Sequence, residues 1–191
     1  MKTNRQHLTI PVVILAVRFK AVLLSILIAV CACAVSCHQD GDSSADGNQE
    51  VAVGDSLPAF RVRLMDGSWV SRDSLIGHRS VVCFFNTGCP DCRQELPMVD
   101  SLFRSHGTKA DVRIVAIARE EEAETIWDFW DTKGLTLPFS AQTDRTVYSL
   151  FAKSRIPRIY MSDTDGIVRF LHDDQTMPDI QQLEEEFGQL K

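Results

Sequence analysis

Residues 80–97 read SVVCFFNTGCPDCRQELP, and this stretch decides the fold. Its first part, Ser80–Phe85, is a nearly continuous apolar run, which is typical of a strand buried on both faces of a sheet. Pro90 suits the first turn of a helix, where its missing N–H leaves no hydrogen bond unmade. We therefore expect a buried strand that leads through a short turn into a helix from Pro90 to about His106.

The flanking segments alternate between strand and helix patterns. We expect further strands over 60–64, 69–70, 112–118, 158–162 and 167–171, and further helices over 120–133, 146–153 and 178–190. Asp66-Gly67 and Asp163–Gly166 have the composition of tight turns and predict two hairpins. This order predicts an α/β fold in which helices flank a mixed central β-sheet.

The six cysteines fall into two groups, at positions 31, 33 and 37 and at positions 83, 89 and 92. An even count suggests a disulfide framework, but such tight clusters are not typical of one. Cys89 and Cys92 stand three residues apart at the predicted helix start, where Cys89 would face the unpaired N–H groups and the positive end of the helix. That setting favours the nucleophilic thiolate, whereas the neighbouring Asp91 opposes it. We therefore expect a rather reducing couple.

The Cys89-Pro90-Asp91-Cys92 motif allows two other interpretations, half of a zinc site and a purely structural disulfide. Zinc needs four ligands, and the remaining candidates show no paired ligand spacing; they are His38, His78, His106 and His172. A disulfide that closes so short a loop gives little entropic stabilisation. Redox chemistry is the preferred interpretation, with neither a metal nor a cofactor.

Residues 1–36 have the features of a bacterial export signal. They contain four basic residues and no acidic one, and their apolar run, Ala21–Val35, is shorter than the roughly 20 residues of a membrane-spanning helix. Small residues lead into Cys37, as at the lipid-attachment site of a lipoprotein. We expect residues 1–36 to be removed and Cys37 to carry lipid. The alternative is an uncleaved anchor that also uses residues 8–17.

The segment after Cys37 predicts a flexible tether. Residues 38–50 contain no apolar side chain larger than alanine, so a tether over 37–50 would lead to a folded domain over 51–191. The whole chain has a net charge of −6, and removing four basic residues brings the exported part to about −10. This acidic balance argues against nucleic-acid binding, which needs a basic face.

Residues 51–191 resemble the TlpA/ResA-type thiol–disulfide oxidoreductases, which are membrane-tethered proteins of thioredoxin fold. The resemblance rests on VGDSLPAF at 53–60, on Glu95 and Pro97 after the cysteine motif, and on Ile156-Pro157 ahead of a strand. It implies a thioredoxin-like fold with an N-terminal β-hairpin. It also implies an extra helix and strand, which residues 120–139 can supply.

The resemblance implies a role for each residue of the site. Cys89 would attack a substrate disulfide, and Cys92, more buried, would resolve the mixed disulfide. Pro157, as a cis-proline, would contact an extended substrate segment together with Ile156 and Pro90. Glu95 would tune a thiol pKa or move a proton near Cys92, unless it is simply an exposed helix carboxylate.

The resemblance also implies partners and a location. The partners would be protein disulfide substrates and an upstream thiol reductant in the membrane. The site would face the periplasm, in the cell envelope, from either the inner or the outer membrane. The substrate stays open between an apocytochrome c, in cytochrome c maturation, and other exported proteins.

Three positions depart from the family pattern. Gly88 stands where the family usually has Trp, which predicts a more open site. Arg158 replaces the usual Thr after the proline, where it would stabilise a thiolate, bind an acidic substrate or be solvated. Cys83 stands where thioredoxins place a buried acid, so it would be a third thiol behind Cys92 or a small core residue.

Two other functions are weighed against disulfide exchange. Peroxiredoxins share the fold and the G-D-x-x-P-x-F opening, so a thiol peroxidase is the second hypothesis. They normally place Thr three residues before the catalytic cysteine, whereas Thr87 stands two residues before Cys89. A non-catalytic binding module is the third hypothesis, and an intact Cys-x-x-Cys motif argues against it.

Overall fold

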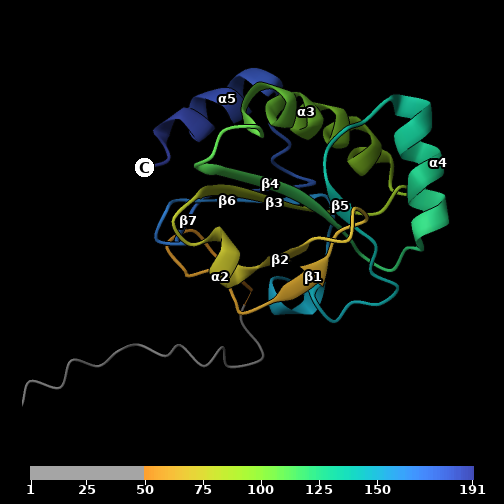
Figure 1. Cartoon of the computed structure of the whole chain (residues 1–191), viewed down its shortest axis with the longest axis horizontal. Coiled ribbons are helices and arrows are strands. Elements are labelled where there is room, and N and C mark those ends of the chain that lie inside the picture. The colour runs from red at the N-terminus through yellow and green to blue at the C-terminus, as the bar shows by residue number, and fades with distance from the viewer. Residues whose placement is uncertain (1–49) are drawn as a thin grey trace, which may run out of the picture. The chain divides into compact units, whose positions relative to one another are not determined.

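A five-stranded mixed sheet organises residues 50–191, the part of the chain that this computed structural model describes (Figure 1). The predicted signal segment, Cys37 and the predicted tether as far as residue 49 lie outside the described residues. The sheet has the order β5-β4-β3-β6-β7. Its strands are β3 (Arg79–Phe85), β4 (Val112–Ala118), β5 (Phe139–Ser140), β6 (Arg158–Ser162) and β7 (Val168–Asp173).

Strand directions confirm the predicted mixed sheet. β3, β4 and β5 run parallel, whereas β6 pairs antiparallel with both β3 and β7. β3 lies at the centre of the sheet, and its residues from Ser80 to Phe85 are all buried, as their apolar run indicated. Successive side chains of this strand point to opposite faces, so the two faces receive different cores.

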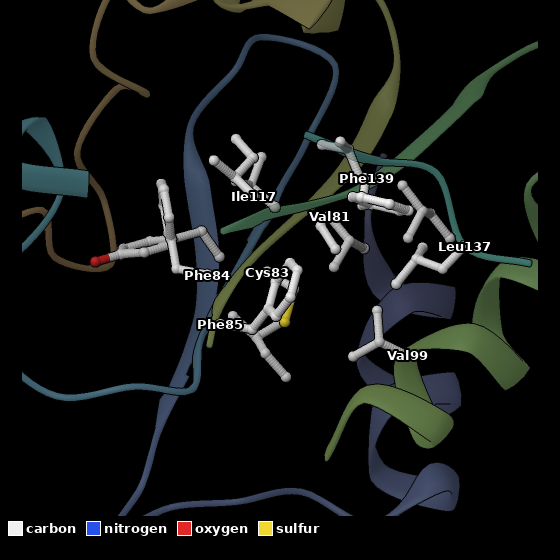
Figure 2. Packing of buried hydrophobic residues seen from close by; sticks show 14 of the residues in the cluster. Val81, Cys83, Phe84, Phe85, Val99, Ile117, Leu137 and Phe139 are labelled. Atoms are coloured by element: carbon white, nitrogen blue, oxygen red, sulfur yellow. The ribbon is translucent and has the colours of Figure 1, made fainter. Parts of the chain in front are cut away.

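One face of the sheet carries the cysteine motif. Helices α3 (Pro90–His106) and α5 (Ile180–Gln189) lie side by side on this face (Figure 1). Phe85 packs against Trp130 of α4 (Ala123–Lys133), with ring centroids 5.1 Å apart. Figure 2 shows Cys83 in the same buried cluster as Val99 of α3. The helix that presents the motif therefore rests on the central strand.

The opposite face holds an aromatic core. Phe84 contacts Tyr148, Phe151 and Tyr160, with centroid distances of 5.4, 4.8 and 6.1 Å. Tyr148 belongs to η1 (Tyr148–Leu150), a single 3-10 turn in place of the helix expected over 146–153. The short turn places its tyrosine against Phe84 of β3.

The N-terminal hairpin is present; its first strand is shorter than the pattern predicts, and its second is one residue longer. β1 (Arg61–Arg63) pairs antiparallel with β2 (Trp69–Ser71). A helical turn that the sequence analysis missed, α2 (Arg72–Leu75), follows directly. Ser71 and Ser74 form its capping box, in which each side chain bonds the other residue's N–H.

The helix expected over 120–133 begins three residues later, as α4. Glu120 has a left-handed backbone with φ of 59°, and the N–H of Glu121 donates to the Gln142 carbonyl at 2.8 Å. The chain is held in a bend there, so the predicted start of this helix is wrong. α4 and β5 are the extra helix and strand that the resemblance implied.

The buried carboxylate of Asp100 ties this insertion to α3. It accepts hydrogen bonds from the N–H groups of Thr136 and Leu137, at 2.6 and 2.7 Å, and pairs with Arg104 at 2.6 Å. The closing helix α5 is likewise fixed at its start, where Asp179 accepts from the Gln182 N–H at 2.8 Å. Within residues 50–191, no helix is both long and apolar enough to cross a bilayer.

Two glycines with left-handed backbones give a matched test of the turns. Gly134 ends α4 with φ of 62°, and Gly166 turns between β6 and β7 with φ of 74°. Alanine in this conformation costs roughly 1–2 kcal/mol at either site. A Cβ at position 166 would also lie 2.5 Å from Cδ1 of Ile76, whereas position 134 has open space. We expect Gly166→Ala to lower the free energy of unfolding more than Gly134→Ala, measured by urea denaturation; equal losses would show that Ile76 moves aside without cost.

Candidate active site

The Cys-x-x-Cys motif lies at the start of α3, just after the turn that follows β3. Cys89 is the N-cap residue and Pro90 follows it in the first helical turn. Cys89 is partly exposed, whereas Cys92, one turn further along, is fully buried. The thiols of Cys83, Cys89 and Cys92 are all free. An outside reagent can therefore reach Cys89 but not Cys92.

The Ile156-Pro157 loop lies directly beside Cys89. Its peptide bond is cis, as the resemblance implied, and the Cys89 thiol lies 3.5 Å from the Ile156 carbonyl oxygen. Both loop residues are buried, whereas Pro90, which follows Cys89 in sequence, is exposed. The structure thus brings Ile156 and Pro157 next to Cys89, from which they are separated by 67 residues or more in sequence.

Burial controls the chemistry of Cys92. It raises the pKa of the Cys92 thiol well above the usual range, and the neighbouring Cys89 and Cys83 raise it further. A hydrogen bond from the backbone of Asn86 acts in the opposite direction without restoring an ordinary pKa. Cys92 therefore rests as a thiol and needs a proton acceptor before it can act as a nucleophile.

Glu95 is a buried carboxyl group one helical turn beyond Cys92. Its side chain is fully buried, and neither carboxyl oxygen has a hydrogen-bond partner among residues 50–191. Burial raises the pKa of Glu95 to about 7. The interpretation of Glu95 as an exposed helix carboxylate is therefore wrong. Residues three apart on a helix share a face, so Glu95 lies on the Cys92 side of α3.

Cys83 and Arg158 lie on opposite faces of the sheet. Cys83 is fully buried in the core, and burial together with the nearby Glu95 raises the pKa of its thiol. Arg158 pairs in register with Phe84, so its side chain lies on the aromatic face, away from α3. It is buried and bonds Glu50, so the expectations of a solvated charge or a thiolate partner are wrong.

A buried carboxylate that sequence reasoning missed holds the turn before Cys89. Glu121 accepts from the Thr87 N–H at 2.8 Å and from the Thr87 hydroxyl. Asn86 extends this contact, because its amide donates to the carbonyls of Arg119 and Glu120 at 3.1 and 3.3 Å. Three adjacent glutamates at 120–122 look alike in sequence, so no local signal marks the one that turns inward.

Replacing Glu121 tests this contact. Glu121→Ala leaves the Thr87 N–H buried without an acceptor, and we expect it to lower the free energy of unfolding by about 2 kcal/mol. Glu121→Gln keeps an acceptor, so its loss should be below about 1 kcal/mol. Glu122→Ala is the control, because Glu122 is exposed and its side chain makes no capping bond. Urea denaturation of the three variants measures the difference, and equal losses for residues 121 and 122 would contradict the assignment.

Across the part of the chain that the structure describes, no cluster of three or more His, Cys, Asp or Glu side chains could hold a metal ion. The chemistry available at this site is that of two thiols, one buried carboxyl group and the carbonyl of the cis-proline loop.

Comparisons with known proteins place this geometry in a context. Residues 53–171 match the model of the AhpC/TSA family. The thiol–disulfide oxidoreductase ResA of Oceanobacillus iheyensis is 26% identical over 152 residues, which cover 78% of this chain and 76% of the relative.

Solved structures show the fold. A solution structure from Bacteroides thetaiotaomicron, of a protein provisionally named a protein disulfide isomerase, has a TM-score of 0.65 at 25% identity. The match covers 73% of this chain and 92% of that one. A thioredoxin family thiol:disulfide interchange protein of Chlorobium tepidum has a TM-score of 0.60 at 22% identity, over 72% and 96% of the two chains. The fold is therefore thioredoxin-like.

Proposed function

The chain belongs to the AhpC/TSA family, and from this premise we propose that Cys89 and Cys92 carry out thiol–disulfide exchange on protein disulfides. The observation that carries the proposal is a partly exposed cysteine at a helix start, with a buried cysteine one turn on and a cis-proline loop beside it. The matched relatives named thiol–disulfide oxidoreductases support the same reaction class.

The reaction begins at Cys89. Its thiolate attacks one sulfur of the substrate disulfide, a mixed disulfide forms, and the second substrate sulfur leaves as a thiolate. Cys92 then gives up its proton and attacks the sulfur of Cys89. The substrate leaves with both sulfurs reduced. The enzyme is left oxidised by two electrons, with a disulfide bond between Cys89 and Cys92. An upstream thiol reductant must return two electrons before the next turnover.

Glu95 supplies a proton acceptor for the second step. Cys92 is a thiol at rest, and a carboxyl group with a pKa of about 7 is partly ionised at neutral pH. Neither carboxyl oxygen of Glu95 has a hydrogen-bond partner among residues 50–191, so a proton from Cys92 would reach Glu95 through a bridging water molecule. This would make resolution of the mixed disulfide depend on pH.

Substrate approach is open on the exposed side of the motif. Gly88 and Pro90 are exposed and flank Cys89, whereas Ile156 and Pro157 form the buried wall. The Ile156 carbonyl offers a hydrogen bond to an extended substrate strand, because chain pairing of that kind uses backbone groups. These features suit a protein segment that presents its cystine in an extended conformation.

We propose the cell envelope as the working location. Residues 1–36 have the charge and length of an export signal and lead into Cys37 as a lipid-attachment site. The proposed upstream reductant would then be a membrane thiol protein. Apocytochrome c or another exported protein with exposed cystines would be the substrate.

A thiol peroxidase is the competing function, and the position of Thr87 argues against it. A peroxidatic cysteine needs hydroxyl and N–H donors around the peroxide. The Thr87 hydroxyl instead donates to Glu121, so it is already engaged away from Cys89.

One assay pair tests the proposal against this competitor. The purified protein, with dithiothreitol as the electron source, should accelerate reduction of insulin disulfides. Its consumption of hydrogen peroxide should stay close to the rate of an ordinary cysteine. Rapid, Cys89-dependent peroxide consumption without insulin reduction would replace the proposal with a peroxidase.

A further inference from the structure

Side chains from the aromatic face of the sheet hold the cis-proline loop, residues 154–157. Disulfide chemistry does not itself require these side chains. Tyr148 lies under the loop with its hydroxyl oxygen 2.5 Å from the carbonyl oxygens of both Ser154 and Arg155. The guanidinium groups of Arg119 and Arg145 lie over its ring, 5.2 and 5.4 Å from the centroid. The tyrosine is therefore fixed in place, and two successive loop carbonyls converge on its hydroxyl.

Arg158 reaches the same loop from the strand that follows it. Its Nε donates to the Ser154 carbonyl at 3.3 Å, and its Nη2 donates to Glu50 at 2.8 Å. The side chain is only 6% exposed, so its charge needs the Glu50 carboxylate as a partner. Glu50 also accepts from the Lys153 N–H at 2.9 Å, which ties it to the start of the same loop.

The loop has a backbone that needs such support. Arg155 has φ of 71°, a left-handed conformation that a residue with a Cβ seldom adopts, and its guanidinium bonds Asp174 at 3.2 Å. The next residue, Ile156, carries the carbonyl that faces the Cys89 thiol. The contacts at Ser154 and Arg155 therefore set where the Ile156 carbonyl lies.

We propose that Tyr148 and Arg158 are positioning residues for protein substrates, because together they hold residues 154–157 against Cys89. This inference rests on the proposed function and deepens it. Neither side chain touches a thiol, since both lie on the aromatic face of the sheet, opposite α3. Their effect therefore acts through the loop, on the surface that grips an extended substrate segment, and neither side chain contacts the Cys89 thiol directly.

The test compares a substrate that needs the loop with one that does not. Reduction of insulin disulfides uses a protein chain, whereas the reaction of the reduced enzyme with 5,5′-dithiobis(2-nitrobenzoate) needs only the Cys89 thiolate. We expect Tyr148→Phe and Arg158→Thr each to raise the KM for insulin about fivefold, the scale of one lost hydrogen bond, with kcat changed less than twofold. The rate with the small disulfide should stay within twofold of that of the unaltered protein.

Two further variants guard the interpretation. Arg158→Lys keeps the charge, but its single ammonium lacks the fork that donates to Ser154 and Glu50 together, so KM should rise here as well. Arg79→Thr is the matched control, because Arg79 pairs with Asp111 at the opposite end of β3 and should leave both rates unchanged. Should Arg158→Thr fail to fold, Tyr148→Phe and Arg158→Lys carry the same test.

The outcomes separate this inference from the proposed function. If the unaltered protein reduces insulin while Tyr148→Phe and Arg158→Lys do so with unchanged KM, the positioning role is wrong. If these variants lose both reactions in equal proportion, the residues act on Cys89 or on folding alone, and the inference is also overturned. If the unaltered protein reacts with the small disulfide but never with insulin, the proposed function itself fails.

Discussion

Cys89→Ser abolishes reduction of protein disulfides, and Cys92→Ser traps the substrate, if the exchange runs as proposed. Cys89 is the thiol that an outside sulfur can reach, so its loss removes the first bond-forming step and should lower turnover by at least about 10³-fold. Cys92→Ser leaves that step intact and removes only the second nucleophile. The mixed disulfide then persists for as long as no other thiol attacks it.

The measurement is a non-reducing gel of cell envelopes. Cys92→Ser protein should appear in bands above its own mass that disappear when dithiothreitol is added. The protein that carries both Cys89→Ser and Cys92→Ser should give no such bands. Cys83→Ala is the matched control, because Cys83 is a third free thiol, buried in the core on the same face. It should keep insulin reductase activity within a few-fold while losing some stability to the cavity. An absence of trapped partners with Cys92→Ser, alongside full activity of Cys89→Ser, would contradict the assignment.

The cysteine motif, its helix and the two central strands were predictable because each depends on local pattern. Val81–Phe85 is apolar throughout, and Pro90 marks a helix start whatever the rest of the chain does. α3 and β4 accordingly have the predicted bounds. The bend at Glu120 was not predictable, because a left-handed glutamate carries no sequence mark and is held by backbone hydrogen bonds to the distant residues Gln142 and Asp144.

The contacts that support the site could not be predicted from the sequence, for a different reason. Arg158 is 108 residues from Glu50, and Thr87 is 34 residues from Glu121, so neither pair has a spacing that a pattern could reveal. For Glu95 the sequence left the burial of the side chain open. Helical spacing places it near Cys92 but does not show whether a carboxyl group there is buried or exposed. Burial is a property of the assembled layers, and only the packing of α3 on β3 decides it.

Buried Glu95 makes the stability of the protein depend on pH. The folded-state pKa of about 7 lies above the ordinary value of 4.5, so between these values the folded protein keeps a proton that the unfolded chain releases. Below pH 4.5 the carboxyl group is neutral in both states and costs nothing. As pH rises from 4.5 to 7 the unfolded state is favoured by about 1.4 kcal/mol per pH unit, and above 7 the loss levels off near 3 kcal/mol.

Glu95→Gln should remove this dependence while keeping the shape of the side chain. Between pH 5 and pH 8 the free energy of unfolding, from urea titrations, should fall by about 2.5 kcal/mol more in the unaltered protein than in Glu95→Gln. Glu124→Gln serves as the control, because Glu124 is exposed on α4 and its replacement should leave the profile of the unaltered protein. Parallel profiles for the unaltered protein and Glu95→Gln would show that Glu95 is ionised in the folded state at both pH values.

The same carboxyl group should govern the second chemical step. If Glu95 takes the proton of Cys92, the single-turnover rate of mixed-disulfide resolution rises with pH through about 7 as the carboxylate forms. Glu95→Gln has no carboxylate to form, so its rate should be roughly 10²-fold lower at pH 8 and should follow the direct ionisation of Cys92 at higher pH. The rate at which Cys89 forms the mixed disulfide, measured by rapid quench in the Cys92→Ser background, should be nearly unchanged. If the stability profile flattens in Glu95→Gln but the resolution rate does not change, Glu95 is a buried carboxyl group with no catalytic role. If formation and resolution of the mixed disulfide slow equally, Glu95 acts on Cys89 as well.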